Sequence, residues 1–173
     1  GTAALQLASA LGSRVFATAS TAEKCTACVA LGAERAINYR DEDFVEVVLE
    51  LTGGEGVDVI LDMVGGDYLG RNLKALRSNG RLVQIATQAG HKVEMSLASI
   101  MAKGAYVTGS RLRPRPIEEK VQIAKQLERV VWPLLARRRI KPVIDTTFAF
   151  SNADQAHAHM ESSEHIGKIL LTP

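Results

Sequence analysis

Apolar positions in this chain alternate between a spacing typical of helices and a spacing typical of strands. At the start, Ala3, Leu7 and Leu11 recur at helical spacing, and Gly12 follows where a glycine often ends a helix. Short β-rich runs separate such segments, and some of them, such as residues 57–62, are largely apolar. Strands of this kind are usually buried on both faces. The pattern therefore favours a parallel sheet with helices on each side.

The same pattern predicts a regular succession of elements. Helices are expected at 3–11, 24–31, 41–52, 65–76, 95–103, 117–138 and 151–160, and strands at 14–19, 35–39, 57–62, 81–86, 105–109, 143–149 and 168–171. Residues 78–80 are expected to form the turn that leads into strand 81–86. Repeated strand and helix units of this length predict a doubly wound α/β sheet. Because the pattern of short helices and strands is interrupted by the long helix, we place a domain boundary after it, near Lys141.

Composition and charge narrow the class of protein. The 173 residues are 46% hydrophobic and 23% charged, as in ordinary folded domains. With 21 Lys and Arg against 19 Asp and Glu, the charge is too balanced for a whole-molecule binder of nucleic acid or membrane surfaces. No run approaches the roughly 18 apolar residues of a membrane span. The chain holds only two cysteines, so no disulfide framework is expected and a reducing, cytoplasmic setting is the default.

The first residues carry a possible nucleotide-binding signal. Gly1 stands directly before the first helix, as the last glycine of a dinucleotide-binding loop does, where the helix N-terminus faces a pyrophosphate. The alternative is a plain interior glycine. Since the chain begins at Gly1 without a Met or a leading strand, we expect it to be part of a longer protein.

Three side chains near the ends of the strands expected at 14–19 and 35–39 bear on the choice of cofactor. Enzymes that prefer NAD place a carboxylate at the end of the strand that follows the first helix, where it binds the adenosine ribose. Here that strand ends at Ser20, and the nearest carboxylate, Glu23, lies within the next helix. Ser20, Lys24 and Tyr39 could instead bind a 2′-phosphate. The alternative is a helix cap, a solvated lysine and a surface tyrosine.

Other polar groups admit simpler explanations. Cys25 and Cys28 form a C-x-x-C pair, but they lie inside a helix rather than at its start, so we expect them to pack. The separation of His157, His159 and His165 also argues against a metal site.

A basic stretch follows the expected strand 105–109. Residues 110–142 hold ten Lys or Arg against three Glu. The last three of its arginines, 137–139, complement the dipole at the end of a helix. Arg111 and Arg113 follow a strand end, where ligands collect in this fold, and one of them could steer a cofactor or an anionic substrate. Simple solvation is the alternative for both.

Several segments together resemble one family over essentially the whole chain. They are GTAALQLA, the Ser20 to Lys24 spacing, LGAERAINYRDEDF, GGEGVDVILDMVGG, NGRLVQIATQAG, GSRLRPRP and HIGKILL. In this order they resemble the zinc-independent quinone oxidoreductases of the medium-chain dehydrogenase/reductase superfamily, in particular bacterial relatives of the p53-inducible quinone oxidoreductase.

The resemblance implies an NADPH-dependent reduction of quinones or related conjugated carbonyls. It also implies a Rossmann-like domain over 1–140 that lacks its first strand, and a segment, 141–173, that would join a GroES-like catalytic domain absent from this sequence. A homodimer through the edge strand 105–109 is expected as well. The rivals are an enoyl or enone reductase of the same superfamily and a cofactor-binding protein without catalysis. A nucleic-acid module ranks last.

The resemblance also assigns residues to the cofactor groove. Lys24 and Tyr39 match positions that hold the 2′-phosphate. Two loops match those that line the groove, and their residues are Val64, Gly65, Ala86 and Thr87. No catalytic residue can be assigned, because any such group supplied by the absent part lies outside this sequence.

Overall fold

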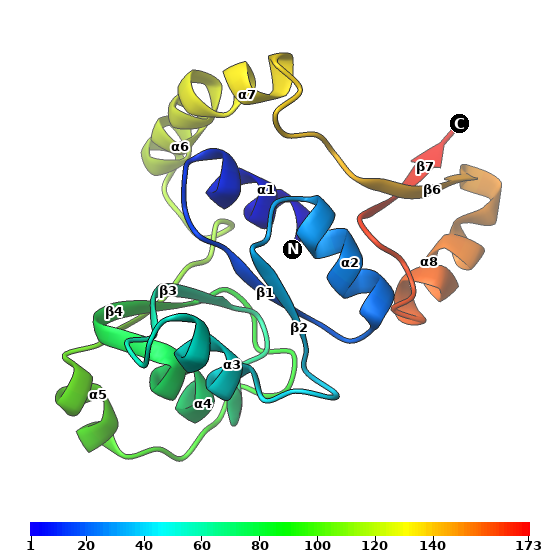
Figure 1. Cartoon of the computed structure of the whole chain (residues 1–173). Coiled ribbons are helices and arrows are strands. Elements are labelled where there is room, and N and C mark those ends of the chain that lie inside the picture. The colour runs from blue at the N-terminus through cyan, green and yellow to red at the C-terminus, as the bar shows by residue number, and fades with distance from the viewer. The chain divides into compact units, whose positions relative to one another are not determined.

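The computed structural model describes residues 1–173 as alternating helices and parallel strands (Figure 1). The helices are α1 (Thr2–Ala10), α2 (Ala22–Ala30), α3 (Phe44–Leu51), α4 (Tyr68–Ala75), α5 (Leu97–Lys103), α6 (Ile117–Val130), α7 (Trp132–Ala136) and α8 (Ala153–Glu161), with a 3₁₀ turn, η1, at Phe150–Asn152. The strands are β1 (Phe16–Ala19), β2 (Arg35–Asn38), β3 (Val57–Asp62), β4 (Leu76–Gln84), β5 (Tyr106–Gly109), β6 (Ile144–Ala149) and β7 (Lys168–Thr172). The expected α/β alternation is confirmed.

All strand pairs are parallel, as expected, and they form three sheets. The order is β1-β2 in the first, β3-β4-β5 in the second and β6-β7 in the third. The chain divides into two compact units, one of residues 1–40 with 122–173 and the other of residues 41–121.

The unit of residues 41–121 has a core on one face of its sheet. Leu73, Leu76 and Leu82 are at most 2% exposed, and partly buried side chains from α4, β3 and α5 pack against them. Burying a side chain of this size contributes about 1.5–3 kcal/mol. The other face differs from expectation, because Val59 and Leu61 on β3 are 60% and 48% exposed. Side chains alternate along a strand, and within this unit the core covers only the face opposite to these two.

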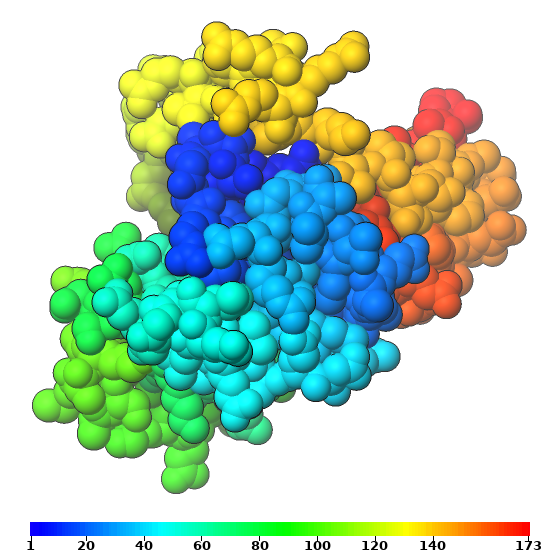
Figure 2. All heavy atoms as spheres, viewed as in Figure 1, coloured from blue at the N-terminus to red at the C-terminus, as the bar shows by residue number.

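In the other unit, α2 packs on the β1-β2 sheet, whose residue Ile37 is fully buried. Residues of α1 and α2, in blue, form a continuous packed surface on the face seen in Figure 2. The side chain of Gln6, itself buried, donates to the Lys141 carbonyl and accepts from the Lys141 N–H, both at 3.0 Å. This amide acts like a peptide group in a strand pair, so it ties α1 to the segment that leads into β6.

The single helix expected over 117–138 is divided in two. α6 ends at Val130 and α7 begins at Trp132, with Pro133 in its first turn. Proline has no N–H to donate and its ring clashes with the carbonyl four residues earlier, so a helix cannot continue through it unbroken. None of the helices is long and apolar enough to cross a membrane.

The turn expected at 78–80 lies inside a strand instead. β4 starts at Leu76, which pairs with Val57, and the register then jumps so that Val59 faces Arg81. The intervening residues form an irregularity in which Asn79 has a φ of 59°. Asparagine tolerates this left-handed conformation better than most residues, which explains the turn-like signal.

Candidate cofactor site

The carboxyl ends of β1 and β2 lie together, as two parallel neighbours must. Ala19 pairs with Asn38, and the N–H of Tyr39 donates to the Ala19 carbonyl at 3.1 Å. Ser20 follows β1 directly, and Tyr39 is 42% exposed just after β2. The structure therefore brings two of the expected ligands to one edge of the sheet, where a hydroxyl and a phenol are available to a ligand.

Lys24 belongs to the first turns of α2. Thr21, not Ser20, caps this helix by accepting from the Lys24 N–H at 3.2 Å. The Lys24 ammonium donates to the carbonyl of Ser163, just past the end of α8. Carbonyls at a helix C-terminus attract cations, which explains the contact. Sequence reasoning gave no sign of it, because the two residues are 139 positions apart.

The loops that follow β3 and β4 are bonded to each other through their main chains. The Ala89 N–H donates to the Val64 carbonyl at 2.8 Å, and the Gln88 N–H donates to the Met63 carbonyl at 3.1 Å. Gly65 has a φ of 71°, and a Cβ at this position would lie 2.8 Å from the Gly90 carbonyl oxygen. The structure thus brings together the loops that hold Val64 and Gly65 on one side and Ala86 and Thr87 on the other.

Asp62 is a further residue of this region that the sequence reasoning did not single out. It ends β3 and is only 4% exposed. Its carboxylate accepts from the Val64 N–H at 2.6 Å and from the Asn72 side chain at 3.0 Å, with longer bonds from the Gly65 N–H at 3.3 and 3.4 Å. A carboxylate that ends a largely apolar strand was the signal that could have revealed it.

The remaining expected ligands are exposed. Gly1 precedes α1, and its carbonyl accepts from the Leu5 N–H at 3.1 Å. Arg111 and Arg113 lie in the loop after β5, where the Arg113 carbonyl accepts from the Lys120 ammonium at 2.9 Å. The expected cofactor residues therefore divide between the two units.

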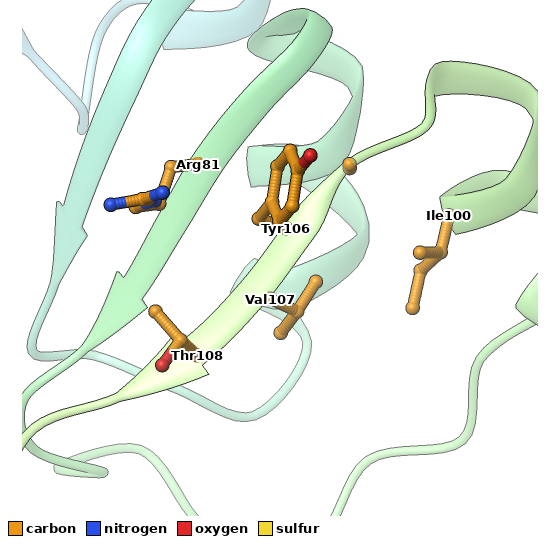
Figure 3. Close-up of a pocket in the computed structure, with 6 residues that line it drawn as sticks. Arg81, Ile100, Tyr106, Val107 and Thr108 are labelled. Carbon is orange, nitrogen blue, oxygen red and sulfur yellow. The ribbon is translucent and has the colours of Figure 1, made fainter.

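A shallow depression beside the edge strand β5 contains none of these expected residues (Figure 3). It is lined by Arg81, Ile100, Ala105, Tyr106, Val107 and Thr108. Arg81 and Tyr106 are register partners on β4 and β5, and the guanidinium lies 5.6 Å from the centre of the phenol ring. We assign this depression to the sheet edge rather than to the cofactor site.

Comparison with known proteins identifies the family to which the chain belongs. Residues 1–131 match the family described as zinc-binding dehydrogenase. The chain is 34% identical to quinone oxidoreductase 1 of Escherichia coli, with 100% of this chain and 53% of that protein aligned. It is 32% identical to a 2-haloacrylate reductase of Burkholderia, with 94% of this chain and 49% of that protein aligned.

Solved structures show the same likeness. A crystal structure of Escherichia coli quinone oxidoreductase complexed with NADPH superposes with a TM-score of 0.85 at 33% identity, covering 100% of this chain and 53% of that one. The chain therefore belongs to the zinc-binding dehydrogenase family, within the medium-chain dehydrogenase/reductase superfamily. It spans about half the length of the curated relatives it matches.

The family's description raises the question of a zinc site. No group of three or more His, Cys, Asp or Glu in this chain is arranged to hold a metal. Cys25 and Cys28 are half-buried on α2, and burial raises the pKa of the Cys28 thiol, which disfavours the thiolate that a metal would need. His159 Nε2 instead lies 2.8 Å from Asp145 Oδ2. The residues present do not fit a zinc ion.

Proposed function

We propose that this chain is the nucleotide-binding part of an NADPH-dependent oxidoreductase that reduces quinones or related conjugated carbonyls without zinc. The observation that carries the proposal is the joint edge of β1 and β2, where Ser20 and Tyr39 lie, where the β1 end has no carboxylate, and after which α2 carries Lys24 in its first turns. An ammonium and two hydroxyls suit a 2′-phosphate, whereas the ribose of NAD is usually held by a carboxylate. The NADPH-bound relative supports the same cofactor.

The residues of this chain act by binding and orienting. Ser20, Lys24 and Tyr39 would hold the adenosine end of NADPH, and the loops of Val64, Gly65, Ala86 and Thr87 would contact another part of it, as the family resemblance implies. Arg111 or Arg113 would steer the anionic cofactor or substrate toward it. Bound NADPH supplies a hydride to an electron-poor substrate, and the protein positions the two and excludes water.

A reductase of carbon–carbon double bonds is the second candidate. The likeness to a 2-haloacrylate reductase favours it, since a haloacrylate carries such a bond conjugated to a carboxylate. Hydride delivery and cofactor binding would be the same, so the two candidates differ only in substrate.

A substrate panel tests both candidates in the full-length protein. NADPH oxidation is followed by the loss of the absorbance of the reduced nicotinamide, with benzoquinones, enones and haloacrylates at matched concentrations. We expect turnover with quinones at the highest kcat/KM. Turnover confined to enones or haloacrylates would shift the assignment to the double-bond reductases. NADPH binding without oxidation by any acceptor would indicate a cofactor-binding protein without catalysis.

We also propose that the protein acts as a cytoplasmic homodimer joined through β5. This strand is the edge of its sheet, and all its residues are exposed, including Tyr106 at 58% and Val107 at 42%. Open edge strands with apolar side chains pair readily with a second copy. Sedimentation of the full-length protein checks this. The full-length protein with Val107→Lys should sediment as a monomer. A wild type that is monomeric at all concentrations would contradict the proposal.

A further inference from the structure

We infer that Asp62 is a positioning residue for NADPH: its buried carboxylate fixes the loop after β3 in the shape that receives the part of the cofactor beyond the adenosine end. This inference rests on the proposed function. It concerns a residue that touches the loop and not the cofactor, so its effect must pass through the backbone of Val64 and Gly65.

The carboxylate is buried with uncharged donors only. The groups that donate to it are the Val64 and Gly65 N–H groups and the Asn72 side-chain amide. An ionised carboxylate costs much free energy to bury unless its oxygens accept hydrogen bonds. Because the loop supplies two of the three donor groups, the loop conformation and the buried charge depend on each other.

The carbonyls of the same loop are also used within the protein. The Asp62 carbonyl accepts from the Ile85 N–H at 2.8 Å and the Gln84 side chain at 3.3 Å. The carbonyls of Met63 and Val64 accept from the loop after β4. Both N–H groups face the carboxylate, so the loop has none left at these positions to bind a phosphate. The loop therefore suits a part of NADPH other than its phosphates.

The conformation of the loop after β3 also constrains the loop after β4, because the two loops pack closely. Gly65 lies against Thr87, whose Cα would be 3.1 Å from a Cβ at position 65. The side-chain amide of Asn72 on α4 donates to the Asp62 carboxylate and so helps to orient it, and Asn72 is itself only 4% exposed. A change at Asp62 would release the Val64–Gly65 segment and alter the wall that both loops form, while leaving Ser20, Lys24 and Tyr39 untouched.

Two ligands separate this role from general damage. Adenosine 2′,5′-bisphosphate contains only the adenosine end and the 2′-phosphate, whereas NADPH also contains the nicotinamide half. In the full-length protein we expect Asp62→Asn to weaken NADPH binding about tenfold to a hundredfold, the range for losing hydrogen bonds to a charged group. The Kd of the bisphosphate should stay within about twofold of wild type, because its proposed site lies elsewhere.

Matched variants complete the experiment. Asp58→Asn removes an exposed carboxylate from the same strand and should leave both ligands unaffected. Asn72→Ala removes one donor and should weaken NADPH binding less than Asp62→Asn does. It serves as the main variant if Asp62→Asn does not fold. Combining Asp62→Asn with Asn72→Asp restores a donor and acceptor pair and should recover part of the NADPH affinity.

The outcomes distinguish a failure of the Asp62 inference from a failure of the proposed function. If Asp62→Asn and Asn72→Ala lower the melting temperature but keep wild-type NADPH affinity, or weaken both ligands equally, Asp62 is merely structural and the inference is wrong while the proposed function stands. If the wild type binds the bisphosphate but not NADPH, the inference is likewise overturned. If the wild type binds neither ligand, the proposed function itself fails, and this inference falls with it.

Discussion

The two strand-end regions of this chain are built on different principles. At the ends of β1 and β2, the candidate ligands are side chains such as Lys24 and Tyr39, which stand at or near the surface. At the ends of β3 and β4, the loops are shaped by main-chain hydrogen bonds and by the buried carboxylate of Asp62. Substitutions in the first region should change ligand choice with little loss of stability, whereas those in the second should cost stability and cofactor fit together.

Gly65→Ala should give the largest effect, in the backbone-built region. A Cβ at a φ of 71° and 2.8 Å from the Gly90 carbonyl oxygen adds both strain and a clash. We expect a loss of about 3 kcal/mol in the free energy of unfolding, measured by urea denaturation. Gly54→Ala is the matched control. Its φ is 87° but no atom lies within 4 Å of the added Cβ, so it should cost only about 1 kcal/mol.

Equal losses for these two variants would mean that the loops after β3 and β4 yield easily. The distinction between a rigid and an adaptable strand end would then have to be abandoned.

Lys24→Ala tests the side-chain region. A contact between the ammonium and the 2′-phosphate is worth about 1.5–3 kcal/mol, so NADPH affinity should fall roughly tenfold to a hundredfold while NADH affinity hardly changes. Titration of both cofactors at fixed ionic strength measures this. Lys24 also donates to the Ser163 carbonyl. If Lys24 serves only that contact, Lys24→Ala will lower the melting temperature and change neither the NADPH nor the NADH affinity.

Tyr39→Phe should have a smaller effect of the same kind. Losing one neutral hydrogen bond to the 2′-phosphate costs about 0.5–1.5 kcal/mol, which corresponds to a twofold to tenfold weaker Kd for NADPH. NADH serves as the internal control, because it has no 2′-phosphate. A Tyr39→Phe protein that loses affinity for both cofactors equally would show that the ring, and not the hydroxyl, is what matters.

Asp145 shows how a less buried carboxylate compares with Asp62. Its carboxylate accepts from the Ile166 N–H at 2.7 Å and lies beside His159. Both groups lower the pKa of the Asp145 carboxyl, and the hydrogen bond from Ile166 has the larger effect. A lowered pKa means stability that is complete above the ordinary value of about 3.9 and is lost as the pH falls through the folded-state value.

Asp145→Asn should therefore lower stability at neutral pH by about 1 kcal/mol and make the loss below about pH 4 shallower. Melting temperatures measured across this pH range, with exposed Glu161→Gln as the control, give the comparison. An acid profile identical to that of wild type would show that other carboxylates dominate.

Local patterns were sufficient to predict much of the fold. Helical and strand spacing predicted every strand and nearly every helix, because burial of one face imposes a period on the sequence. Pro133 was a sequence signal for the interruption of the long helix, but the apolar repeat continues past it and favoured a single helix. The paired loops after β3 and β4 came from the family resemblance, which rests on segments such as GGEGVDVILDMVGG.

Contacts between distant residues were decided only by the tertiary structure. Lys24 meets the Ser163 carbonyl, and Gln6 bonds to Lys141 across 135 positions. Nothing in a local pattern encodes such partners, because they depend on where the chain returns in space. The same holds for the partners of Asp62: its place at the end of a largely apolar strand is visible in the sequence, but only the structure shows that Asn72 of α4 and the loop N–H groups bond to its carboxylate. Periodicity therefore determined which segments are helices and strands, and long-range packing determined which polar groups became buried and bonded.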